Sequence, residues 1–185
     1  MRTLDPSPRG RAVCLLVPVL FGAAMTSCTD PVVDDKIDAL GGEVDGVDPG
    51  PDHRPGQPCV LCHSESGPAS DSVFAVAGTV YETAKEKKGA QNVEILLVDS
   101  RGSTPLRLDN GKQVPFYTSA SGNFLVRADE WPNLRFPVKV GIAKGFVHTM
   151  QSHIAREPSC ATCHHDPDKA VFGDRLSAVG HIYVQ

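Results

Sequence analysis

The chain has 185 residues, of which 41% are hydrophobic, and a formal net charge of −4 at pH 7. A chain of this size forms one modest domain together with accessory segments. Because nucleic-acid binding depends on basic patches, the acidic balance excludes nucleic acid as an expected partner.

The first residues of the chain are typical of a secretory signal peptide. Arg2, Arg9 and Arg11 form a positive front, and residues 12–25 form an apolar run. This run is followed by small residues and is too short for a comfortable bilayer span. We therefore expect residues 1–27 to direct export and to be removed.

Cys28 follows two small residues directly, and polar Thr29 comes after it. This arrangement resembles the lipobox of bacterial lipoproteins. The resemblance implies cleavage before Cys28, a lipid on its thiol and acylation of the new N-terminus, since stable anchoring takes more than one chain. An ordinary signal peptide followed by an incidental cysteine is the alternative. We expect an exported, lipid-anchored protein in the periplasm, or at the outer membrane or cell surface, of a Gram-negative bacterium.

Residues 28–58 are rich in Asp, Gly and Pro and contain no aromatic residue. Such a composition buries too little apolar surface to offset its ordering entropy, which predicts a flexible acidic tether. Within it, "VDDKIDAL" at 33–40 is compatible with a short helix.

Residues 73–149 consist of short runs of β-branched and aromatic residues separated by turn residues. "DNG" at 109–111 predicts a hairpin turn, because Asn and Gly tolerate positive φ. "SASGN" at 119–123 predicts a second turn. The spacing predicts a mainly β fold, a single antiparallel β-sandwich of about seven strands flanked by irregular segments. The strand candidates are 73–81, 92–99, 106–108, 113–118, 123–128 and 136–149.

Three stretches in this region, "AGTVY" at 77–81, "GAQNVEILLVD" at 89–99 and "TSASGNF" at 118–124, carry a resemblance. They look like the carboxypeptidase regulatory-like, or transthyretin-like, β-sandwich domains of bacterial surface proteins. The resemblance implies the fold of about residues 73–148 and says little about activity, because such domains carry no chemistry of their own.

Two C-x-x-C-H motifs contain every cysteine beyond the exported leader: "CVLCH" at 59–63 and "CATCH" at 160–164. Covalent haem attachment needs two thiols spaced to reach the vinyl groups and an imidazole that follows directly and binds the iron. The sequence therefore predicts two covalently bound haems c. Their thioether cysteines would be Cys59, Cys62, Cys160 and Cys163, and their proximal iron ligands His63 and His164.

Two other uses of these cysteines stay open. The four thiols have the spacing of a zinc site, although such a site needs neither histidine. They also have the spacing of two local disulfides in an oxidising compartment. Either use would make the protein a structural or binding lipoprotein of the cell surface.

The two motifs resemble those of multihaem c-type cytochromes, and the whole chain resembles small bacterial proteins in which such motifs flank a regulatory-like sandwich. The resemblance implies single-electron transfer in the periplasm or at the cell surface, with redox proteins as partners and the membrane reached through the lipid anchor. No Ser-His-Asp cluster or carboxylate pair predicts hydrolysis, so we expect an electron carrier rather than an enzyme. A haem enzyme or gas sensor with one open iron position is a further alternative.

Each low-spin haem needs a second axial ligand, either Met or His. Met150 and His153 come shortly before the second motif and are the first candidates, followed by His181. Other histidines that qualify are His53 in the tether, His148 and His165. We expect haem-binding segments at 59–72 and 150–185, both at one end of the sandwich, where the haems would cover each other's apolar faces.

Overall fold

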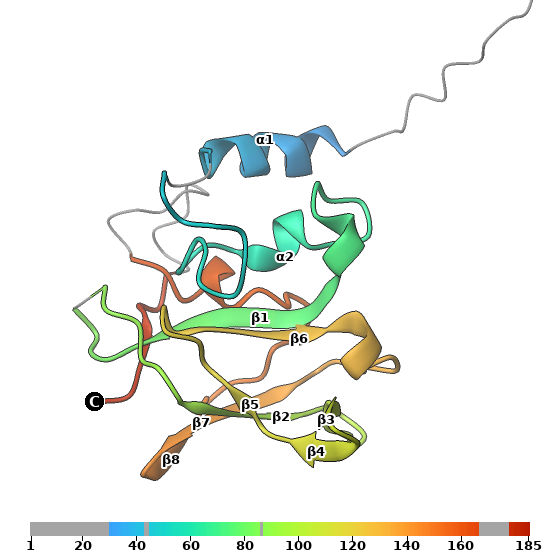
Figure 1. Ribbon diagram of the computed structural model, residues 1–185, viewed down its shortest axis with the longest axis vertical. Coiled ribbons are helices and arrows are strands. Elements are labelled where there is room, and N and C mark those ends of the chain that lie inside the picture. Colours follow the sequence, from blue (N-terminus) through green and yellow to red (C-terminus); the bar gives the residue numbers. More distant parts are fainter. Residues whose placement is uncertain (1–29, 43–44, 86, 167–177) are drawn as a thin grey trace, which may run out of the picture.

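The computed structural model describes residues 30–42, 45–85, 87–166 and 178–185, and within them the protein is mainly β (Figure 1). Expected leader residues 1–27 and the lipid site Cys28 lie outside the described residues. The helices are α1 (Pro31–Ala39), α2 (Cys59–Cys62), η1 (Ser70–Ser72), η2 (Ala128–Glu130) and η3 (Cys160–Thr162). The strands are β1 (Phe74–Tyr81), β2 (Glu94–Val98), β3 (Arg107–Asp109), β4 (Lys112–Val114), β5 (Phe116–Tyr117), β6 (Asn123–Arg127), β7 (Lys139–Lys144), β8 (Phe146–Thr149) and β9 (Ile182–Tyr183).

The strands form two main layers, which Figure 1 shows one above the other. The upper sheet has the order β6-β1-β9, the lower sheet has the order β5-β2-β7-β8, and β3 and β4 form a separate ribbon. The core lies between the layers and contains valines buried completely, which suit the pleated surface of a strand. These valines are Val76, Val80, Val93, Val126 and Val138. The mainly β, sandwich-like fold is thus confirmed.

One edge of the upper sheet differs from the antiparallel expectation. β9 pairs with β1 in parallel, with Val80 opposite Ile182 and Tyr81 opposite Tyr183. The C-terminal residues cover the edge of β1 that β6 leaves open, and covering such an edge satisfies backbone groups that would otherwise be unpaired. Two-residue strands of this kind carry too little pattern to be predicted.

The predicted hairpin turn at 109–111 is confirmed. Asn110 and Gly111 both have positive φ, 49° and 75°, between paired strands β3 and β4. The single strand expected over 136–149 is wrong, because the chain reverses at Gly145, whose φ is 82°. The two halves, β7 and β8, pair antiparallel with each other.

The segment expected to be a tether contains the short helix α1 and a part that is attached to the sandwich. Asp30 caps α1 by accepting a hydrogen bond from the backbone N–H of Val32 at 3.0 Å. Further along, the side chain of Asn123 donates to the carbonyl oxygens of Pro51 and His53, at 3.1 and 2.9 Å. Over residues 51–56 the chain is therefore held against β1 and β6, where the composition alone predicted flexibility.

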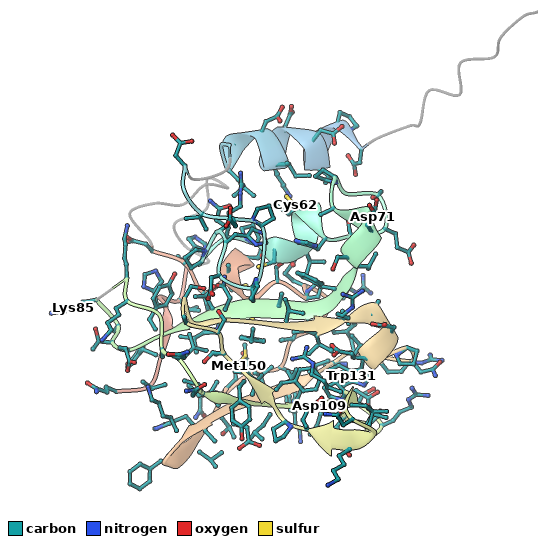
Figure 2. The ribbon with its side chains drawn as sticks, viewed as in Figure 1. Cys62, Asp71, Lys85, Asp109, Trp131 and Met150 are labelled. Atoms are coloured by element: carbon teal, nitrogen blue, oxygen red, sulfur yellow. The ribbon has the colours of Figure 1, made fainter. Side chains whose placement is uncertain are left out.

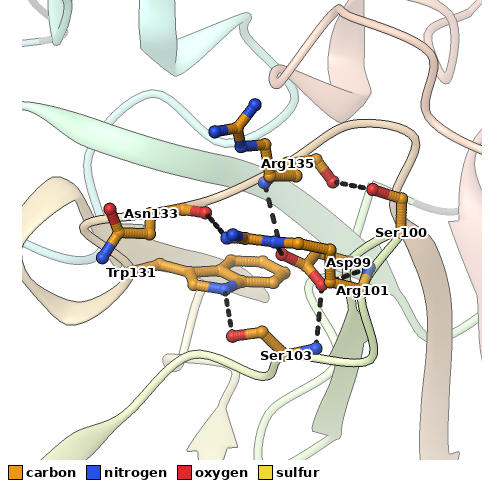
Figure 3. Close-up of polar contacts among 7 residues, drawn as sticks. All are labelled: Asp99, Ser100, Arg101, Ser103, Trp131, Asn133 and Arg135. Carbon is orange, nitrogen blue, oxygen red and sulfur yellow. Dashed lines mark hydrogen bonds and ion pairs between the residues drawn. The ribbon is translucent and has the colours of Figure 1, made fainter.

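A buried carboxylate joins the loop that follows β2 to the loop that precedes β7 (Figure 3). Asp99 accepts hydrogen bonds from the backbone N–H groups of Arg101 and Ser103, both at 2.8 Å, and of Arg135 at 3.3 Å. Burial raises the pKa of Asp99, but these N–H groups and the nearby Arg101 outweigh it, and the net pKa is below its ordinary value. Trp131 is buried beside this cluster and donates to Ser103 Oγ at 3.4 Å.

We expect the substitution Asp99→Asn to lower the melting temperature at pH 7, because an amide group replaces an acceptor oxygen that faces backbone N–H groups. The folded pKa of Asp99 is lowered, so the stability it contributes is present above the unfolded pKa and is lost as the pH falls through the folded pKa. The difference between wild type and variant should therefore shrink below about pH 4. Thermal unfolding at pH 7 and pH 3 measures this difference in melting temperature. Asp71→Asn is the control, because Asp71 is exposed. A difference that is independent of pH would contradict this role.

Candidate functional site

The first C-x-x-C-H motif forms one helical turn, α2, beside β1. The backbone N–H of His63 donates to the carbonyl oxygen of Cys59 at 2.9 Å, so the histidine directly follows the turn. Cys59 and Cys62 are three residues apart in this turn and share one face of it. The His63 ring stacks on Phe74, the first residue of β1, with 3.9 Å between the ring centroids. The motif is thus fixed to the start of β1.

The second motif repeats this local arrangement in the 3-10 helix η3. The backbone N–H of His164 donates to the carbonyl oxygen of Cys160 at 2.8 Å. Cys160 is buried and belongs to the hydrophobic core. Gly78 of β1 leaves the space that the Cys160 side chain occupies. A Cβ at residue 78 would lie only 2.8 Å from Cys160 Cβ and 2.9 Å from its Sγ.

The two histidine rings are oriented in the same way. Nδ1 of His63 lies 2.8 Å from the carbonyl oxygen of Ser72, and Nδ1 of His164 lies 3.0 Å from that of Gly180. A carbonyl only accepts, so Nδ1 carries the proton and Nε2 is left as the unprotonated nitrogen. Metal-bound histidines are commonly fixed by a hydrogen bond of this kind.

Burial also favours the neutral form of both rings. It lowers the pKa of His63 and of His164, and the hydrogen bonds that the rings donate to their carbonyl partners oppose this effect only in part. A neutral imidazole is the form that binds iron.

The two motifs lie side by side, as expected for a shared end of the sandwich. Ser159, which is 2% exposed, accepts a hydrogen bond from the backbone N–H of Val60 at 2.9 Å. Ser159 also lies opposite Ala77 of β1, whose N–H donates to the carbonyl oxygen of Pro158 at 3.1 Å. Residues just before η3 thus connect β1 to the first motif.

The first thiol of each motif is poorly suited to thiol–disulfide chemistry. Burial, followed by the nearby Cys59, raises the pKa of Cys160 to about 12, and burial raises that of Cys59 to about 11. Reactive redox cysteines have a lowered pKa instead. Among the residues that the structure describes, no disulfide joins the four cysteines, and no three His, Cys, Asp or Glu side chains gather as a metal site.

The second motif opens into a cavity of about 960 Å³, which is at the upper end of the range for ligand sites. Apolar side chains, among them Val140, Ile142 and Ile154, form much of its wall. The cavity has the volume and the lining for an apolar group as large as a haem. Its candidate ligands and attachment residues are His148, Met150, His153, Cys160, Cys163, His164 and His181.

The three candidate distal ligands differ in their surroundings. Met150 is half-buried and packs against the core, whereas His153 is exposed. His181 is half-buried and stacks on Tyr81, with 4.4 Å between ring centroids. Figure 2 shows Met150 on the side of β1 that faces the lower sheet and Cys62 on the other side. Met150 and the first motif therefore lie on different sides of β1.

The first motif faces a narrower cavity of about 40 Å³. A haem is larger than this space, although the groups that would bind it surround the cavity: His53, Cys59, Cys62 and His63. Leu40, Arg54 and Gln57 also line the cavity, and none of them is fully buried. The thiols and imidazoles around this cavity are the groups that a haem c needs, whereas the volume of the cavity in this structure is smaller than a haem.

Several residues that shape the site were not expected from the sequence. Gly78 and Ser159 bring the second motif against β1, and Asn123 holds the segment that carries His53. Glycine in a strand signals a close approach of some other group, which was the available hint for Gly78. Nothing in the sequence marked Ser159 or Asn123.

Comparison with protein-family models, with curated proteins and with solved structures found no match for this chain. The resemblance to cytochromes and to regulatory-like domains therefore stays a prediction. In the described part of the chain, no helix is long and apolar enough to cross a membrane.

We expect Gly78→Ala to destabilise the protein by about 1–3 kcal/mol, because the new methyl group overlaps Cys160 and either this residue or β1 must shift. Urea unfolding of the haem-free protein measures the loss. Gly42→Ala is the matched control, since a Cβ there meets nothing within 4 Å. Equal stability of the two variants would contradict the close packing of η3 on β1.

Proposed function

We propose that this protein is an exported, lipid-anchored c-type cytochrome that carries two covalently bound haems and transfers single electrons in the periplasm or at the cell surface. One observation carries the proposal: both C-x-x-C-H motifs present a neutral histidine whose Nδ1 is bound by a backbone carbonyl, which leaves Nε2 for iron. The large apolar cavity at the second motif supports it independently.

In this proposal the chain's residues attach, orient and cover the redox group. The thiols of Cys59 and Cys62, and of Cys160 and Cys163, would each add across a vinyl group to form a thioether. His63 and His164 would bind iron through Nε2, with their orientation set by Ser72 and Gly180. When bound, haem supplies one-electron oxidation and reduction. Apolar residues around the second cavity would exclude water and so favour the less charged state.

The contact between the motifs suits a two-centre electron carrier. The hydrogen bond between Val60 and Ser159 joins the two motifs through their backbones and leaves little freedom in their separation. Both motifs also rest on β1, which is a rigid central strand. The fold would thereby hold two redox centres at a constant short distance, outside the membrane and tethered through Cys28. Redox proteins are the proposed partners.

The intact mass of the protein tests this function directly. Produced together with a haem-attachment system, the wild-type chain should gain the mass of two haems. The double variants C59A/C62A and C160A/C163A should each gain one, and the combined variant none. Mature protein of unchanged mass would contradict the proposal, and a mass increase by zinc or a loss of hydrogens to disulfides would favour a structural lipoprotein.

Met150 is the residue that we expect to complete iron coordination at the second motif. It lies half-buried at the cavity wall, whereas His153 is exposed and His181 follows Gly180, the partner of the proximal His164. Met150→Leu keeps the volume and removes the sulfur. We expect this variant to retain two haems, one of which becomes high-spin and binds carbon monoxide. His153→Ala and His181→Ala should keep the wild-type spectrum, and the reverse pattern would assign the ligand to a histidine.

A further inference from the structure

The ring of His53 faces the ring of His63 at the first motif. Their centroids are 5.9 Å apart, and the ring planes are inclined by 50°. Both rings line the same small cavity, together with Cys59 and Cys62. The two histidines come from separate segments, one from the loop before α2 and the other from the end of α2.

The Nδ1 atom of each ring is already engaged by the backbone. Nδ1 of His63 donates to the carbonyl oxygen of Ser72. Nδ1 of His53 contacts Gly50, through its carbonyl oxygen and, at 3.3 Å, through its amide nitrogen. In both histidines Nε2 is therefore the nitrogen that is left for a further partner.

The distance between the rings is that of two ligands on one metal ion. A bond from a metal ion to an imidazole nitrogen is about 2 Å long, so two imidazoles on opposite sides of the ion have nitrogens about 4 Å apart. The ring centroids of two such ligands lie farther apart than their nitrogens, and the centroid distance of 5.9 Å between His53 and His63 agrees with this arrangement.

A buried polar pair fixes the backbone that carries His53. Asn123 is 8% exposed and donates to the carbonyl oxygens of Pro51 and His53. Its own oxygen accepts a hydrogen bond from Thr79 Oγ1 at 2.7 Å, and Thr79 Oγ1 accepts one from the backbone N–H of Gly56 at 2.8 Å. Burying polar groups is costly unless they are all satisfied, and here the loop satisfies them. The position of His53 is thus specified by the sandwich.

We propose that His53 is the distal iron ligand of the haem attached to Cys59 and Cys62, and that Asn123 is the positioning residue that holds it opposite His63. The assignment rests on the proposed cytochrome function. It gives the first centre two histidine ligands. Since methionine raises the potential of a haem relative to histidine, a centre with two histidines would have a lower potential than a second centre ligated by Met150.

The test uses the holoprotein and the variants His53→Ala and His53→Met, with Asp48→Ala as a control at an exposed residue of the same loop. Attachment needs only the cysteines and His63, so every variant should keep two haems by intact mass. We expect His53→Ala to give one high-spin haem that binds carbon monoxide and His53→Met to raise one of the two potentials. Asp48→Ala should leave both properties unchanged.

Asn123→Ala provides a second, independent measurement. If Asn123 positions the ligand, this variant should bind carbon monoxide partially and should regain the wild-type spectrum when imidazole is added. Near-infrared magnetic circular dichroism of the wild type should show a pair of histidines at one haem. Two attached haems, no such pair and unchanged spectra in the His53 variants would overturn the assignment of His53 and leave the cytochrome function standing. A wild-type protein without haem would overturn both.

Discussion

Strand β1 is buried along both of its faces, and the positions of both C-x-x-C-H motifs depend on this strand. Val76 and Val80 point into the core between the sheets, while Ala77, Thr79 and Tyr81 are covered on the other side. A strand in this position can be covered on each side by a different segment. The open edge receives β9 and the residues just before the second motif, and the side away from the core receives the loop before α2. The sandwich thereby brings together two motifs from opposite ends of its sequence.

The orientation of the two proximal histidines comes from outside the five-residue motifs. Ser72 and Gly180 supply the carbonyl oxygens, and they lie 9 and 16 residues after the histidines that they bind. In each motif, the orientation of the histidine ring therefore depends on a carbonyl group from the segment that follows the motif. Two unrelated segments with the same ring geometry are a stronger basis for a ligand site than the repeated C-x-x-C-H spacing alone, because spacing does not fix a tautomer.

The predictions from sequence were most successful where local chemistry decides. β-Branched runs gave the core strands, and Asn110 with Gly111 gave the hairpin turn, because the backbone of these residues tolerates positive φ. The break at Gly145, the strand β9 and the attached loop were missed. Each of these depends on a tertiary partner: β8 on β7, Ile182 on β1, and the loop on Asn123. Residues 28–58 have the composition of a flexible tether. For this reason His53 ranked low among the candidate distal ligands.

The two halves of the site differ in a way that matters for an electron carrier. The first cavity is narrow and bounded by the paired rings of His53 and His63, whereas the second is large and apolar, with the thioether of Met150 on its wall. In the proposed cytochrome, ligand type and burial would both set the potentials of the two haem irons, and both would act in the same direction. Methionine ligation and an apolar wall would make the second centre the better electron acceptor. With the motifs joined at Val60 and Ser159, electrons entering at the first centre would pass downhill to the second, so the asymmetry of the fold would give the carrier a direction.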